Sequence, residues 1–163
     1  WILSELYKII IEFKKGYIEF NFFVPATSII EFTFNLFSSH YIEMVKGRAY
    51  GTGFSDDERD GAIYTLHKVF STILHLLAPI TPFITDYLWQ SLYSDKTIHK
   101  ERFVEPENNE GLTKFTKEIV EFNSNVWNKK KETGLSLKDS IDFQVPANLE
   151  PFANDLRVMH NLK

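Results

Sequence analysis

Cysteine is absent from the 163-residue sequence, which excludes a disulfide framework, a thiolate metal site and a thiol nucleophile. The formal net charge is −4, so the chain also lacks the overall excess of lysine and arginine that commonly accompanies nucleic-acid binding. No apolar run reaches the length of a membrane span, and we expect no membrane association. A reducing interior suits a chain without cysteine, and we expect a cytoplasmic protein.

The chain begins at Trp1, without methionine and without a basic region leading into an apolar stretch. This start predicts that there is no signal peptide and that the chain is a piece of a longer protein. Aromatic residues are plentiful: 15 Phe, 7 Tyr and 3 Trp predict a core built from large rings. Hydrophobic residues at 44% and charged residues at 25% are the ordinary balance of a soluble globular domain.

The first 95 residues show the apolar periodicity of helices with short breaks between them. Ser55 and Glu58 form a capping box that begins the third helix. Thr81 is a candidate N-cap for the fourth, with Pro82 at its first position. Short breaks favour an antiparallel bundle, which we expect over residues 1–95. The inner face predicted for it includes Leu6, Ile10, Phe13, Ile29, Ile30, Phe37, Tyr41, Ile63, Val69, Ile73, Phe83, Leu88 and Trp89.

The composition changes after this bundle, and the second half predicts a different organisation. A polar connector is expected over 96–112. A small α+β subdomain should follow over 113–163, with a first helix, a strand over 140–145 and a second helix over 149–159. We expect this subdomain to be cut off before its last strand. The predicted fold class is therefore mainly α: an antiparallel helical bundle followed by a small α+β C-terminal element.

Residues that could carry catalysis or hold a metal do not occur in a recognisable pattern. None of the five histidines belongs to a Glu-x-x-His or His-Glu-x-x-His motif, and His67 and His75 share a helix without an obvious third ligand. The Gly51-Thr52-Gly53 stretch is too short for a phosphate-binding loop and follows a helix rather than a strand. We expect no catalytic site, no metal and no bound cofactor in these residues.

Basic residues gather at the ends of two predicted helices, each time beside an aromatic residue. Cations at helix C-termini interact favourably with the helix macrodipole, which is one role for them. The other is to bind the phosphates of an RNA while the neighbouring ring stacks on an unpaired base. Both roles stay open. The candidates for RNA contact are Lys46, Arg48, Tyr50, Lys129, Lys130 and Lys131.

Several stretches resemble the helical anticodon-binding domain of the class I aminoacyl-tRNA synthetases for valine, isoleucine and leucine. LLAPITPFITDYLWQSLY at 76–93 is similar to a helix pair of that family in its prolines, its tryptophan and their spacing. FTFNLFSSHYIEMVKGRAY at 32–50 resembles the long helix that precedes the pair. WILSELYKII at 1–10 and KKKETGLSLKDSI at 129–141 resemble the segments that enter and leave the bundle. The chain departs from the family at Pro25 and in the connector.

The resemblance implies that the chain recognises the anticodon stem-loop of a tRNA. A catalytic domain of the same polypeptide would use ATP and Mg to attach the amino acid. The HIGH and KMSKS signatures of such a domain do not occur here, so no adenylation is expected of this chain. Glu43, Lys46 and Arg48 match the valine-specific members, whereas isoleucine-specific members usually have arginine where Glu43 stands. The resemblance therefore favours valine over isoleucine, and neither DNA nor a membrane is an expected partner.

Two other functions are open from the residues alone. A helical protein-interaction module would dock a partner through exposed aromatic residues, and its binding would be insensitive to salt and to RNA. A carboxylate–metal bundle enzyme would need the Glu-x-x-His pairs that this sequence lacks. Both rank behind tRNA recognition.

Overall fold

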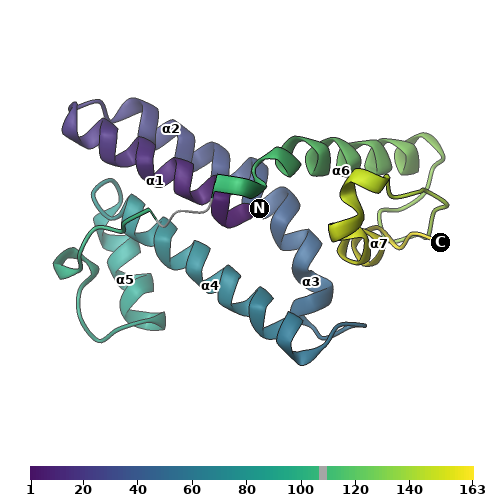
Figure 1. Cartoon of the computed structure of the whole chain (residues 1–163). Helices are drawn as coiled ribbons and strands as arrows, with labels where there is room; N and C mark the ends of the chain where they lie inside the picture. The colour runs from purple at the N-terminus through teal and green to yellow at the C-terminus, as the bar shows by residue number, and fades with distance from the viewer. Residues whose placement is uncertain (107–109) are drawn as a thin grey trace.

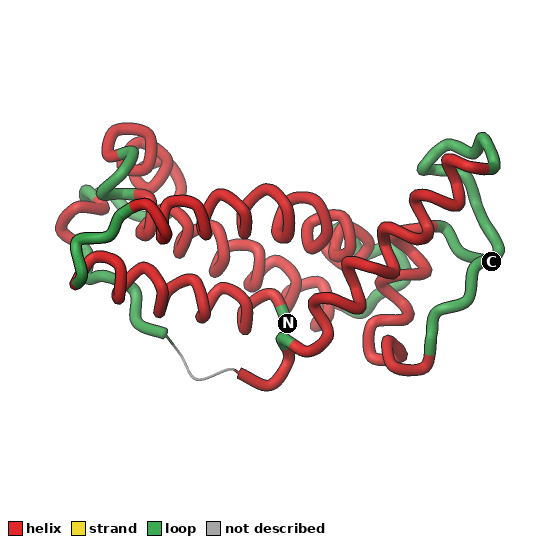
Figure 2. The backbone as a smooth tube through the Cα atoms, turned by 90° about the horizontal axis from the view of Figure 1, so that it is seen from above, coloured by secondary structure: helices red, strands yellow, loops and turns green. Residues whose placement is uncertain are grey.

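The computed structural model describes residues 1–106 and 110–163, and its regular elements in these ranges are helices. Figure 1 shows their arrangement, with the C-terminal segment at the end of an elongated molecule (Figure 2). The predicted class, mainly α with a helical bundle, is confirmed. The α-helices are α1 (Ile2–Ile18), α2 (Phe23–Glu31), α3 (Glu43–Ala49), α4 (Asp56–Leu77), α5 (Pro82–Leu92), α6 (Lys114–Glu132) and α7 (Ala153–His160). A π-helical segment spans Phe32–Ile42, and 3₁₀ turns span Ile98–Lys100, Glu110–Leu112 and Ala147–Phe152.

The long second helix forms as predicted, but its middle is a π-helix that joins α2 to α3 without a break. The hydroxyl of Ser39 donates to the carbonyl oxygen of Phe34 at 2.7 Å, five residues back along the chain. The wider turn places residues five apart on one face. The rings of Phe32 and Phe37 therefore stack with centroids 6.3 Å apart, and Phe37 stacks on Tyr41 at 6.0 Å.

Two apolar clusters fill most of the core. The first joins α1, α2, the π-helical segment and α4 through buried residues such as Leu6, Phe13 and Val69. The second joins α3 to the C-terminal segment: Met44 packs with residues of α6 and α7, among them Val126. Packing therefore crosses the predicted boundary between bundle and subdomain, and the division of the chain into domains stays a prediction.

Helix α4 begins with the predicted capping box. The hydroxyl of Ser55 accepts from the backbone N–H of Glu58 at 3.3 Å, and the Glu58 carboxylate accepts from the backbone N–H of Ser55 at 2.9 Å. These two bonds satisfy donors that a helix start leaves unpaired. Thr81 occupies the predicted N-cap position of α5 with Pro82 after it, but its hydroxyl bonds back to the carbonyl of Leu77 instead of capping α5.

The predicted strand over 140–145 is wrong. Within the described residues, Ile141 forms a single parallel bridge with Leu162, and the segment has no further ladder partner. Alternating apolar residues cannot make a strand without a neighbouring strand to accept its hydrogen bonds. The helix predicted over 149–159 forms as a 3₁₀ turn followed by α7, so the C-terminal element is helical rather than α+β.

Helix α5 turns one predicted core residue outward. Thr85 is buried and Leu88 and Trp89 are half-buried against α4, whereas Phe83 is 90% exposed. Phe83 lies two residues before Thr85, about 200° around the helix axis, so both cannot face α4. The predicted core positions Ile30 and Ile63 are also exposed.

The connector predicted over 96–112 falls partly outside the described residues, at 107–109. Where it is described, it is tied to α5. The Asp86 carboxylate accepts from the backbone N–H of Ile98 at 2.9 Å, and the Ile98 side chain is buried.

Two helical glycines provide a matched test of this packing. A Cβ on Gly16 would lie 2.6 Å from the carbonyl oxygen of Asn21 and would overlap the rigid ring of Pro25. Gly61 has no such atom within 4 Å. We expect Gly16→Ala to lower the free energy of unfolding in urea by about 1–3 kcal/mol because the α1–α2 turn must move. Gly61→Ala should raise it by about 0.5–1 kcal/mol. Equal effects of the two substitutions would contradict the close α1–α2 approach.

Candidate nucleic-acid interface

The residues predicted to contact RNA fall into two separate groups. Lys46, Arg48 and Tyr50 lie at the end of α3, and Lys129 to Lys131 lie at the end of α6. Helix α7 lies between α3 and α6 (Figure 1). The structure therefore does not merge the two groups into one basic patch.

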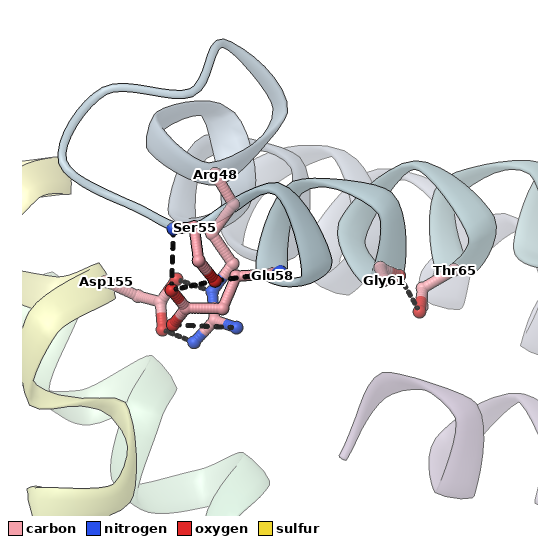
Figure 3. A network of polar contacts seen from close by, with 6 residues as sticks. All are labelled: Arg48, Ser55, Glu58, Gly61, Thr65 and Asp155. Atoms are coloured by element: carbon pink, nitrogen blue, oxygen red, sulfur yellow. Dashed lines mark hydrogen bonds and ion pairs between the residues drawn. The ribbon is translucent and has the colours of Figure 1, made fainter.

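Arg48 is held by acidic side chains rather than left free. Its guanidinium donates to both carboxylate oxygens of Asp155 on α7, at 2.5 and 2.6 Å (Figure 3). A third contact joins it to Glu58 at 3.9 Å, beside the capping box of α4. The hydrogen bonds to Asp155 raise the pKa of Arg48 because they favour the charged guanidinium. Arg48 thus joins α3, α4 and α7.

The other two residues of the α3 group face solvent. Lys46 is exposed and forms an ion pair with Glu43, one turn earlier on the helix. Tyr50 is 80% exposed and is the C-cap residue of α3. Gly51 and Gly53 after it adopt the left-handed conformation, with φ of 70° and 77°, and turn the chain toward α4.

Lys130 is fully buried, unlike the lysines on either side of it. Its ammonium donates at 2.7 Å to the carbonyl oxygens of Leu137 and of His160, the last residue of α7. A cation at that position interacts favourably with the negative end of the α7 dipole. Lys130 therefore fastens α6 to the following loop and to α7, and it offers no surface to a phosphate.

A buried polar chain continues from this point. Nε2 of His160 bonds Oδ1 of Asn123 at 2.8 Å, and Nδ2 of Asn123 bonds Nδ1 of His40 at 3.1 Å. The amide orientation assigns a proton to Nε2 of His160 and a lone pair to Nδ1 of His40. Burial, followed by Lys130 and His40, lowers the pKa of His160 to about 4, and burial lowers the pKa of His40. Both imidazoles are therefore neutral at pH 7.

The end of α6 also presents a shallow hollow that combines a ring with a cation. Trp127 lies against His40 and His160, with ring centroids 5.3 and 5.8 Å away, and its side chain is half-buried. Trp127 and Lys131 line one side of this hollow, and the loop residues Gly134 to Leu137 line the other. Lys129 is exposed on the same turn of α6.

The sequence patterns missed one further cation. Arg157 is exposed on α7 and has no ion pair within the described residues. It stands alone in the sequence, so neither clustering nor a neighbouring aromatic residue singles it out.

Residues 1–106 and 110–163 contain no group of three or more His, Asp or Glu side chains arranged to hold a metal ion. None of the described helices combines the length and apolar character of a membrane span.

Comparison with known proteins identifies the family. The sequence profile of the anticodon-binding domain of tRNA ligase matches residues 1–145. The chain belongs to this family. Individual proteins similar to this anticodon-binding domain are valine–tRNA ligases from Pyrobaculum aerophilum (36% identical), Aeropyrum pernix (35%) and Nanoarchaeum equitans (36%). The matches cover 99%, 90% and 88% of this chain, and 21%, 19% and 18% of the respective relatives. The chain thus spans about a fifth of the length of these ligases.

The buried histidine gives this domain a defined dependence on pH. An unfolded histidine has a pKa near 6.5, whereas His160 in the fold has a pKa of about 4. Between these values the unfolded chain binds a proton and the folded chain does not. The free energy of unfolding should therefore fall as the pH drops from 6.5 to 4, by roughly 3 kcal/mol from this residue. Urea titrations at several pH values measure it.

His160→Gln is the matched control, because its amide can still donate to Asn123 but does not titrate. The difference in unfolding free energy between this variant and the unmodified chain should change across that pH interval and stay constant above it. A difference that does not vary with pH would contradict the buried neutral state of His160.

Proposed function

We propose that this domain holds the anticodon stem-loop of a valine tRNA as part of a longer valine–tRNA ligase. The family match over residues 1–145, together with 35–36% identity to valine–tRNA ligases over most of the chain, carries the proposal. In the longer protein, a catalytic domain would use ATP and Mg in the cytoplasm to attach valine to the tRNA. This domain would orient the tRNA so that its acceptor end reaches that catalytic domain.

The hollow at the end of α6 is the part of the surface best suited to RNA. Single-stranded loops are recognised by rings that stack on unpaired bases and by cations that bind phosphates. Trp127 supplies a half-buried ring, Lys131 supplies a cation that lines the same hollow, and Lys129 supplies a second cation on the same turn of α6. Both lysines also interact favourably with the negative end of the α6 dipole, and this role is compatible with binding a phosphate.

The end of α3 would provide a second contact through Lys46 and Tyr50. An exposed ion pair such as Lys46–Glu43 contributes little to stability, so a phosphate can replace the glutamate at small cost. Arg48 would not contact RNA. Its contacts with Asp155 and Glu58 hold α3 against α7 and α4, and so position the exposed residues at the end of α3. Lys130 likewise holds α6 against the following loop and α7 and does not contact solvent.

The competing function, a protein-interaction module that does not bind RNA, is separated from this one by the effect of salt. Phosphate contacts release counterions, so affinity for tRNA should fall steeply with salt concentration. Isoleucine specificity is the alternative within the family, and only the identity of the bound tRNA separates it from valine.

Lys129→Gln combined with Lys131→Gln tests the α6 contact. We expect weaker binding to fluorescently labelled valine tRNA and a salt dependence of log K shallower by about 0.7–0.9 for each phosphate that the variant no longer neutralises. Fluorescence anisotropy at several salt concentrations gives both values. Lys117→Gln, an exposed lysine at the other end of α6, is the control and should leave the slope unchanged. An unchanged slope in the double variant, or an equally weakened control, would remove these lysines from the interface.

A further inference from the structure

The indole of Trp127 on α6 contacts one histidine from each of two other elements. Its ring centroid lies 5.3 Å from that of His40, in the π-helical segment Phe32–Ile42, and 5.8 Å from that of His160, the last residue of α7. Both histidines are buried, whereas Trp127 is half-buried and lines the hollow at the end of α6. The two imidazoles therefore support the ring from inside the fold.

A single buried side chain bonds both of these histidines. Asn123 is 0% exposed and lies one helical turn before Trp127 on α6. Its Oδ1 accepts from Nε2 of His160 at 2.8 Å, and its Nδ2 donates to Nδ1 of His40 at 3.1 Å. A hydrogen bond to an imidazole nitrogen restricts rotation of that ring, so Asn123 sets the orientation of both rings that Trp127 contacts.

The same set of buried bonds reaches the opposite side of the hollow. Spacings of four and three residues place Asn123, Trp127 and Lys130 along one side of α6. The ammonium of Lys130 donates to the backbone carbonyl of His160 and to that of Leu137, which lines the hollow across from Trp127. His160 is thus bonded at its ring and at its carbonyl, and both sides of the hollow depend on these contacts.

We propose that Asn123 is a positioning residue for RNA binding: by bonding His40 and His160, it holds the ring of Trp127 in the orientation that stacks on an unpaired base. This inference rests on the proposed function of the hollow. Asn123 is buried and does not touch the RNA, so its contribution passes through the ring. A ring that is already held in place loses little conformational freedom when a base stacks on it, which favours binding.

The alternative is that the three bonded side chains only stabilise the fold. Removing one partner from a buried polar chain lowers the free energy of unfolding whether or not the chain has a further role. A purely stabilising role leaves the affinity of the folded chain for RNA unchanged. A positioning role lowers that affinity, and it does so only while Trp127 is present.

Asn123→Leu removes both hydrogen bonds and keeps the branched shape of the side chain. We expect the affinity of the folded variant for fluorescently labelled valine tRNA to fall about tenfold, a loss comparable to that of one stacked base. The salt dependence of log K should not change, because no cation is removed. Trp127→Ala should weaken binding at least as much. The double variant should bind no more weakly than Trp127→Ala alone, because Asn123 acts through the ring.

The indole N–H resonance of Trp127 reports the position of the ring directly. In two-dimensional ¹H–¹⁵N NMR spectra, Asn123→Leu should shift this resonance, which Trp127→Ala identifies by removing it. The resonance of Trp89, which packs on α4 and α5 away from α6, should stay in place. A shift confined to Trp127 means that the fold is retained and that the ring has moved locally.

Thr85→Val is the matched control. Thr85 is also buried, at 2% exposure, and its hydroxyl donates to the carbonyl oxygens of Thr81 and Pro82 at the start of α5. Losing these bonds should lower the free energy of unfolding in urea. The affinity for tRNA and the Trp127 resonance should both stay as in the unmodified chain, because α5 packs on α4 and not on the hollow.

His40→Gln tests the same inference if Asn123→Leu does not fold. Its amide oxygen can still accept from Asn123, but the ring beside Trp127 is gone, so binding should weaken and the Trp127 resonance should shift. Additive losses in the double variant, or unchanged affinity in His40→Gln while the unmodified chain binds tRNA, would overturn this inference alone. No binding by the unmodified chain would overturn the proposed function and, with it, the role of Asn123.

Discussion

The bidentate ion pair between Arg48 and Asp155 holds the C-terminal segment against the helical bundle. It can form because Gly47, one residue earlier, leaves room for α7: a Cβ there would lie 2.6 Å from Cγ1 of Val158. The same guanidinium reaches Glu58 in the first turn of α4. One cation on α3 thus contacts carboxylates on both α4 and α7 and ties the three helices together. At the other end of α7, the ammonium of Lys130 on α6 donates to the carbonyl oxygen of His160 and holds α6 against α7.

Because Arg48 and Lys130 are engaged inside the fold, neither is available to bind RNA, which matters for a chain whose net charge is negative. Charges that are buried or paired with carboxylates hold helices together and add little to the field outside the protein. In the proposed function, the attraction for tRNA comes from a few exposed residues, chiefly Lys131 beside Trp127 and Lys129 on the same turn of α6. A domain that spans about a fifth of its relatives' length can also share the work of neutralising phosphates with the rest of the polypeptide. The net charge of −4 is therefore compatible with a localised RNA interface.

Local patterns predicted those parts of the fold that depend on nearby residues. The capping box at Ser55 and the extents of the helices follow from side-chain oxygens, apolar periodicity and helix-breaking residues. The π-helical segment was missed because a period of 3.6 residues was assumed where residues five apart, Phe32 and Phe37, share a face. The strand over 140–145 was predicted from alternation alone, and no pattern within it reveals that a partner strand is missing.

The candidate site was predicted less well than the fold, for the same physical reason. Lys129, Lys130 and Lys131 are adjacent and chemically identical, yet the helical rotation of about 100° per residue buries only the middle one. Arg48 has a carboxylate partner more than a hundred residues away, which no local pattern identifies. The resemblance of 76–93 and 32–50 to a family correctly predicted the family of the chain, while the distinction between structural and exposed cations required the positions of α6 and α7.

The most direct test of tRNA recognition is to transplant the anticodon. Binding of this chain would be measured by fluorescence anisotropy to valine tRNA, to isoleucine tRNA, and to isoleucine tRNA that carries the valine anticodon, at one fixed low salt concentration. Our account predicts that the transplanted tRNA binds as tightly as valine tRNA and more tightly than unmodified isoleucine tRNA. Equal binding of all three tRNAs, or preference for the isoleucine anticodon, would contradict recognition of the valine anticodon by this domain.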